Sequence, residues 1–305
     1  MTWPAHALFS LAELERYVPT IAAASVELLT DIAAAVANDI EAYLERRIVY
    51  RAPTEDDDAI YSGTFTAGSP VPTGQPAGIG RTLVVSFPAT ATAGTLTVTG
   101  TVAGTAGTVR VFSVADGLTQ YGLDFWTAIS ALSIAAAAGG GTIKIGTSAG
   151  YIEYHSPDGA SAELWPLETP VYQIAAIYED STRAYTTALA STAYLAAERR
   201  RLVRLSSGLI SSWAAGYRAV KSVYSAGFLP SAVPAKIKRA ALRLAALYYR
   251  ESVNGQIEVA SGSNPLGVWT RSGSATLNKE LRWDIETERN FSPRTGERDF
   301  DEAAA

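Results

Sequence analysis

The strongest helical pattern in the sequence is VPAKIKRAALRLAALYYR, residues 233–250. Its apolar side chains recur at spacings of three and four residues, so one face of a helix would hold them all. Pro234 suits the first turn, where a backbone N–H has no partner within the helix. The stretch therefore predicts an amphipathic helix whose apolar face carries Ile237, Ala241, Leu244 and Tyr248.

Strands are predicted upstream of this helix and further helices at the start of the chain. Residues 171–178 after Pro170, residues 202–205, and residues 217–225, which Gly227 ends, are the strand candidates. Ser10 with Glu13 three residues later predicts a capping box for a helix over residues 11–18. A longer helix is predicted near residues 25–47, with an apolar face formed by Leu29, Ile32, Val36, Ile40 and Tyr43.

Residues 61–161 differ in composition from both flanking regions. They hold few charges and many Thr, Gly and Ala residues, with short alternating runs at 83–87, 96–98, 109–111 and 143–145. Alternation with period two, broken by Gly and Pro, predicts several short strands. We therefore expect a small antiparallel β-sandwich, inserted into a loop of the surrounding domain.

The predicted fold class is α+β. Residues 1–60 and 162–252 are expected to form one discontinuous, mostly helical domain with a small β-sheet, and residues 61–161 an inserted all-β, sandwich-like module. Residues 253–305 are expected to be an extended tail. This tail is polar and poorly periodic, yet it carries four aromatic residues that could anchor it on a partner surface or on its own domain: Trp269, Trp283, Phe291 and Phe300.

Composition excludes several classes of protein. The chain has 305 residues, no cysteine and a net charge of −5, which excludes disulfides and thiolate chemistry and argues against a protein that coats nucleic acid. No apolar stretch approaches the roughly 20 residues of a membrane helix. The N-terminal residues lack a basic region followed by an apolar one, so neither a signal peptide nor a membrane partner is expected.

Motifs for catalysis, cofactors or metals are not found, and the chain is predicted not to be an enzyme. His6 and His155 are the only histidines and have no zinc-like or triad-like spacing. The glycines at 139–141 lack the Lys-Ser/Thr continuation of a phosphate-binding loop. The acidic run at 55–58 could bind a divalent cation through oxygen ligands, but a solvated linker is the preferred interpretation. No cofactor is expected.

Two groups of charges are candidate contact sites. Arg199, Arg200, Arg201 and Arg204 could face DNA or an acidic partner, or could be the exposed arginines of a hairpin. The other group shares one face of the last helix and could pair with Asp31 or Glu41 of a neighbouring subunit, or could be solvated: Lys236, Arg239 and Arg243.

Three segments resemble the head–tail connector family, the head-completion adaptors of long-tailed bacteriophages. Residues 31–47 are similar to the first long helix of that family, and LETPVYQI at 167–174 is similar to its characteristic strand. VYSAGF at 223–228 with the helix at 233–251 is similar to its final strand and helix. Residues 96–146 separately resemble an accessory β-module of phage structural proteins. The long insertion and the tail depart from the family pattern.

The resemblance implies a virion structural protein of the neck, assembled in the host cytoplasm. Such proteins form a ring of about twelve copies under the portal protein, extend the DNA channel and present a docking surface for a tail-terminator or stopper protein. DNA would pass through without sequence-specific binding. The alternative is a phage adhesion or carbohydrate-binding protein that acts through the β-module. Four aromatic residues of this module could stack on sugars, or could instead belong to the core of the sandwich: Tyr121, Phe125, Trp126 and Tyr151.

Overall fold

The computed structural model describes residues 3–4, 7–19, 21, 26–44, 46–51 and 54–254. These residues are mostly β, with 40% in strands and 23% in helices. The predicted mostly helical main domain is therefore wrong. Among the described residues, one compact unit combines those up to residue 49 with those from 230 to 254, and the other comprises residues 50–229. The predicted boundaries at 60/61, 161/162 and 252/253 stay predictions.

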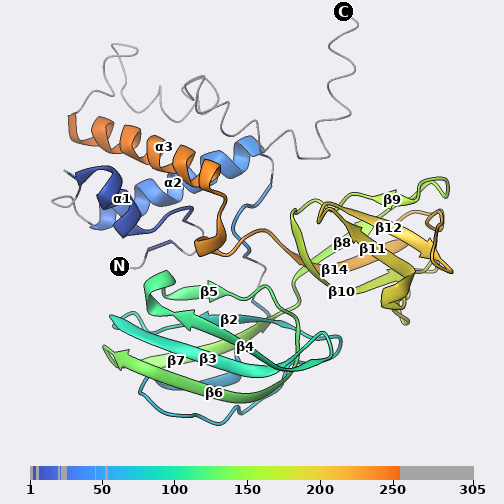
Figure 1. The fold of residues 1–305 in the computed structure, drawn as a ribbon, viewed down its shortest axis with the longest axis horizontal. Coiled ribbons are helices and arrows are strands. Elements are labelled where there is room, and N and C mark those ends of the chain that lie inside the picture. The colour runs from blue at the N-terminus through green and yellow to red at the C-terminus, as the bar shows by residue number, and fades with distance from the viewer. Residues whose placement is uncertain are drawn as a thin grey trace, which may run out of the picture. The chain divides into compact units, whose positions relative to one another are not determined.

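In the described part of the first unit there are three α-helices, α1 (Leu11–Tyr17), α2 (Val26–Leu44) and α3 (Ala235–Asn254), with α3 packing against both others (Figure 1). The capping box is confirmed, since the Ser10 hydroxyl accepts from Glu13 N at 3.2 Å and the Glu13 carboxylate accepts from Ser10 N at 2.8 Å. Lys238 on α3 forms an ion pair with Glu13 at 2.8 Å. Among the described helices, none is both long and apolar enough to cross a membrane.

Two antiparallel sheets form the predicted sandwich in the second unit (Figure 1). One sheet has the order β1-β7-β2-β5 and the other β4-β3-β6. Alternating side chains from both sheets meet in one core, as expected for strands that bury one face. The bounds of these strands are β1 (Asp56–Thr64), β2 (Thr82–Ser86), β3 (Ala93–Val102), β4 (Thr105–Ser113), β5 (Thr119–Tyr121), β6 (Trp126–Ala138) and β7 (Thr142–Ser148).

The longest strand, β6, is not predicted from the sequence. Its buried residues Trp126, Ile129 and Leu132 are three apart, because the register with β3 shifts at irregular positions. Those shifts replace the period of two that marks a strand, and the intervening Ala and Ser residues have no strong strand preference. At one shift, Gly100 lets the chains approach closely, since a Cβ there would lie 2.1 Å from the carbonyl oxygen of Ala128.

The remaining strands form two further sheets around a second apolar core. The first has the order β10-β14-β8; in the second, β12 pairs with β11, β13 and β9. The predicted strands at 171–178, 202–205 and 217–225 are confirmed as β10 (Val171–Glu179), β12 (Arg201–Ser206) and β14 (Val220–Ala226). The others are β8 (Tyr151–His155), β9 (Glu163–Leu164), β11 (Tyr194–Ala197) and β13 (Leu209–Ile210). With two to five residues each, these are too short to show a clear alternation, which is why the helical content was overestimated.

Hydrogen bonds join the sandwich to the β10-β14-β8 sheet. Phe125 N donates to the Gln173 side chain at 2.8 Å, and the buried Ser225 hydroxyl donates to the Leu123 carbonyl at 2.6 Å. The strand β8, which the sequence assigned to the inserted module, pairs along its length with β14. The sandwich is therefore continuous with its neighbouring sheet and not a module held by linkers alone.

Trp126 is the largest fully buried side chain of the sandwich, and its replacement tests the core. Trp126→Ala is expected to lower the free energy of unfolding by about 3–5 kcal/mol because it leaves a cavity. Trp126→Phe should cost less, because the phenyl ring fills most of the space and leaves a smaller cavity; both variants remove the buried indole N–H, which has no acceptor among the described residues. Urea unfolding measures both variants, and equal losses would contradict the cavity as the cause.

Candidate functional site

The charges predicted to lie between subunits occupy different environments on the helical unit. Asp31 on α2 and Lys236 and Arg239 on α3 are exposed, while Arg243 is half-buried. Glu41 is buried, and its carboxylate accepts a hydrogen bond from Ile48 N at 3.0 Å within the subunit. Contact of these residues with a neighbouring subunit stays a prediction. Asp31 and Lys236 are better placed for such a contact than the buried Glu41, because they are exposed.

The predicted arginine cluster is divided between different contacts. Arg201 pairs with Glu163 at 2.5 Å, and Arg204 pairs with Glu179 at 2.9 Å while its guanidinium lies over the Trp213 ring. These carboxylates offset much of the positive charge that the sequence displays. Arg199 is exposed and Arg200 half-buried at the turn before β12. A partner-facing role for the cluster stays a prediction, and it applies chiefly to Arg199.

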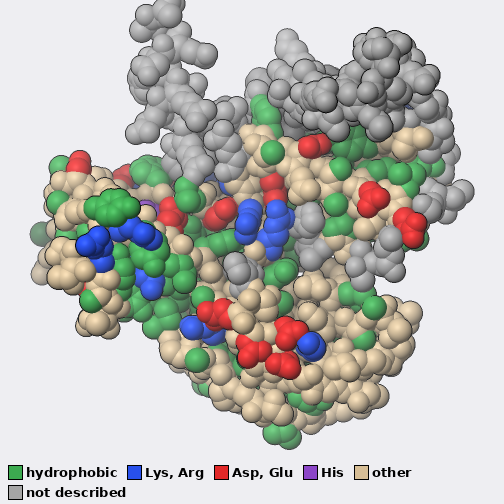
Figure 2. Space-filling model, turned by 180° about the vertical axis from the view of Figure 1, so that it is seen from behind, with side chains coloured by type: hydrophobic (Ala, Val, Ile, Leu, Met, Phe, Trp, Pro, Cys, Tyr) green, Lys and Arg blue, Asp and Glu red, His purple; other side chains and the backbone are tan. Residues whose placement is uncertain are grey.

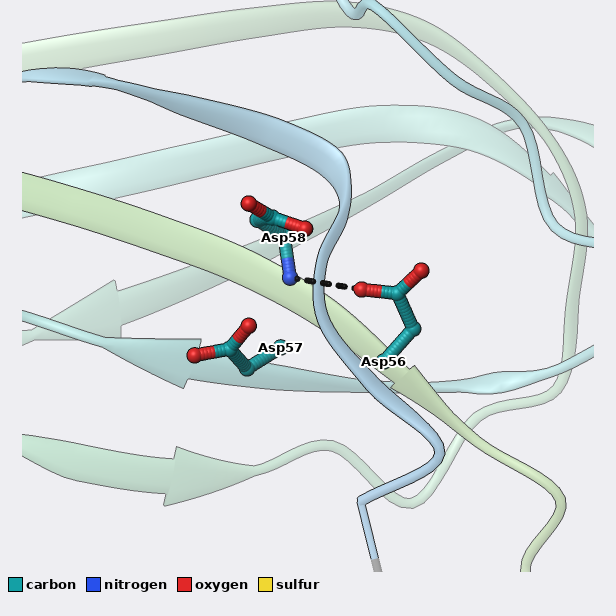
Figure 3. Close-up of side chains that lie close together, drawn as sticks. All are labelled: Asp56, Asp57 and Asp58. Atoms are coloured by element: carbon teal, nitrogen blue, oxygen red, sulfur yellow. Dashed lines mark hydrogen bonds between the residues drawn. The ribbon is translucent and has the colours of Figure 1, made fainter.

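The acidic run is not a linker, because Asp56, Asp57 and Asp58 begin β1 (Figure 3). Their carboxylate oxygens lie within 4.8 Å of one another, and all three residues are exposed. The pKa of Asp58 is raised, first by its hydrogen bond to Asp56 and further by the negative charges of Asp56 and Asp57. Lys144 on β7 pairs with Asp57 at 2.5 Å.

Basic side chains flank acidic ones on the sandwich in the space-filling view (Figure 2). Besides Lys144 with Asp57, Arg81 pairs with Glu55 at 2.6 Å. Exposed ion pairs of this kind contribute little stability and are common on protein surfaces. The acidic run is accordingly a solvated, partly paired strand edge, with the exposure that the sequence predicts but with regular structure.

Strand pairing also assembles a Ser–His–Glu constellation that no sequence motif reveals. The Ser222 hydroxyl lies 3.0 Å from His155 Nε2, and His155 Nδ1 lies 3.8 Å from Glu153 Oε1. The order is that of a hydrolytic triad, but Ser222 is completely buried in the central strand β14. A substrate could reach its hydroxyl only if the sheet opened, and 3.8 Å is too long for a hydrogen bond.

The constellation instead satisfies buried polar groups. The Glu153 carboxylate accepts from the Tyr224 hydroxyl at 2.7 Å and from Leu167 N at 2.9 Å. Burial and the neighbouring carboxylate raise the pKa of the Tyr224 hydroxyl far above its ordinary value, so this group stays protonated and donates. These contacts fix β8, β14 and the segment before β10 together.

The aromatic residues proposed for carbohydrate contact are mostly core. Phe125 and Trp126 are buried, and Tyr121 and Tyr151 are half-buried and pack edge-on against the buried Tyr50. This placement gives the adhesion alternative no open ring platform at Phe125 or Trp126. His6 and the tail residues Trp269, Trp283, Phe291 and Phe300 lie outside the described residues.

No protein-family model, curated protein or solved structure matches this chain.

His155 gives the fold a predicted pH dependence. Burial lowers its pKa below the ordinary value of 6.5, against the opposing effect of the Glu153 carboxylate. Below about pH 6.5 the unfolded chain therefore binds more protons than the folded one, and stability falls as the pH falls. His155→Gln should weaken this decline between about pH 7.5 and pH 5.5, measured by urea unfolding. If instead the wild-type chain gains stability relative to His155→Gln as the pH falls, the Glu153 carboxylate raises the pKa of His155 more than burial lowers it.

Proposed function

We propose that this chain is a structural head–tail connector of a tailed bacteriophage. In this function it forms a ring under the portal protein in the virion neck, extends the DNA channel and provides the docking surface for a tail-terminator or stopper protein. The proposal rests on one observation: the three segments that resemble the connector family are joined to one another in sequence or by packing. β10 pairs with β14, β14 leads into α3, and α3 packs against α2.

The physical requirements of a ring agree with the surface of the helical unit. A closed ring needs two different, complementary patches on each subunit. Asp31 on α2 and Lys236 on α3 are exposed and of opposite sign, so they can orient neighbouring subunits through electrostatic complementarity. The net charge of −5 gives the subunit no overall attraction for duplex DNA, which favours free passage of the DNA over its retention. The β-sandwich is the accessory part, directed at the capsid rim or neck fibres.

Charge reversal at these two positions tests the ring interface. Lys236→Glu and Asp31→Lys alone should each lower incorporation into particles several-fold, because each places like charges across every interface of the ring. The double variant should recover incorporation, since the pair is restored with reversed sign. Incorporation is measured by quantifying the chain in purified particles.

Arg16→Glu is the matched control, because Arg16 is exposed on α1 and belongs to neither proposed patch. Its incorporation should equal that of the unmodified chain. If the double variant is as defective as the single ones, Asp31 and Lys236 do not face each other between subunits.

The tail is proposed to dock on the portal or on a neighbouring subunit through its aromatic residues. Trp283→Ala should reduce incorporation while the subunit keeps its unfolding midpoint, because an interface anchor contributes to binding and not to the core. Unchanged incorporation would contradict the anchor role.

A further inference from the structure

One row across the β10-β14-β8 sheet combines two tyrosines with a lysine. Lys221 on β14 lies opposite Tyr154 on β8 and opposite Tyr178 on β10. Side chains at directly paired positions stand on the same face of a sheet. The adjacent residues Val220 and Ile177 point into the apolar core on the other face, so this row lies on the outer face. Tyr154 keeps 39% of its surface exposed.

The loop after β10 adds a third tyrosine to this row. The Asp180 carboxylate accepts from the backbone N–H groups of Thr182, Ala184 and Tyr185. The loop so formed places the Tyr185 ring 5.7 Å from Tyr154 and 6.3 Å from Tyr178, measured between ring centroids. Tyr185 thus contacts both other rings at inclined angles, 49° to Tyr154 and 69° to Tyr178, and the three rings form one aromatic cluster.

Arg218 completes the group from the turn before β14. Its guanidinium lies 3.9 Å from the centroid of the Tyr154 ring, and its carbonyl accepts from the Tyr185 hydroxyl. Tyr185 and Arg218 both have positive φ, +49° and +52°. L-residues rarely adopt this conformation, which shapes the two turns here as it does at six other non-glycine positions of the described chain.

The two cations of this group lie beside aromatic rings. Lys221 Nζ lies 5.4 Å from the Tyr178 centroid and 5.6 Å from the Tyr185 centroid. Within the described residues, neither Lys221 nor Arg218 has a carboxylate oxygen within the 4.0 Å of an ion pair. Six other cations do have such a partner: Arg81, Arg110, Lys144, Arg201, Arg204 and Lys238.

We propose that this tyrosine–cation face, formed by Tyr154, Tyr178, Tyr185, Arg218 and Lys221, binds single-stranded nucleic acid. The two cations supply contacts for phosphates, and the tyrosine rings supply surfaces on which exposed bases stack. A duplex hides its base faces within the helix and would use the cations alone. An acidic peptide would leave the rings without flat partners. The inference does not depend on the connector function, since it rests on this face alone.

Binding is tested with the full chain and a fluorescently labelled oligothymidylate of about 12 nucleotides, within the site sizes of known single-strand binding surfaces. Fluorescence anisotropy should show binding that weakens with salt. Tyr154→Ala should weaken it about ten-fold through the loss of one stacked base, and Tyr154→Phe should retain it. Arg218→Gln and Lys221→Gln should each reduce the slope of log K against log salt by about 0.7.

Lys144→Gln is the matched control, because Lys144 is a half-buried cation of the sandwich, as Lys221 is of its sheet, but is paired with Asp57. It should leave the affinity unchanged. The proposal is overturned if the oligonucleotide does not bind, or if a duplex of the same length binds as tightly. A second result would also overturn the proposal: heparin displaces the oligonucleotide completely, and Tyr154→Ala keeps both the affinity and the unfolding midpoint of the unmodified chain. The face would then be a site for polyanions or anionic glycans.

Discussion

The pairing of β14 with strands on both of its sides is the constraint on which most of the structure depends. β14 lies between β8 and β10 and leads through a short connection into α3. All of its residues except Lys221 are buried, so each polar side chain on it needs a partner inside the protein. Ser222 meets His155, Tyr224 meets Glu153, and Ser225 meets the Leu123 carbonyl. These partners join the sheet to the sandwich and to the segment before β10.

The same pairing decides which polar side chains of the sheet are buried within the protein and which a ligand could contact. Ser222 and His155 combine a nucleophile with a base, yet they face an interior that the sheet seals. Lys221 is only one residue away and stands on the opposite face, among tyrosine rings. In a strand, a shift of one residue exchanges the two faces. The position of a residue on β14 therefore decides whether it stabilises the fold or is accessible to a partner.

Much of the fold is predictable where the pattern is local. The capping box of Ser10 and Glu13, the three helices and the strands β2, β10, β12 and β14 follow from spacing and boundary residues. The strands β9, β11 and β13 have only two to four residues each and show no clear alternation, so the sequence underestimates the strand content of the main domain. The register shifts of β6 disturb its alternation, so this strand is not predicted either.

The candidate sites depend more on long-range pairing than the elements do. Glu153 and Ser222 are 69 positions apart in the numbering and become neighbours only through the β8–β14 register. Arg204 looks like part of a basic cluster in the sequence, but Glu179 on another strand pairs with it. Tyr185 reaches Tyr154 because the Asp180 carboxylate shapes the loop after β10. These contacts cannot be predicted from the spacing of residues within any one segment of the sequence.

Cryo-electron microscopy of the neck of particles that contain this chain tests the connector function most directly. The expected result is a closed ring of this protein immediately beneath the portal, with α2 and α3 of adjacent subunits at the interfaces and DNA along the central channel. Density for the chain on the fibres or the capsid surface, with a different protein in the ring position, would contradict it.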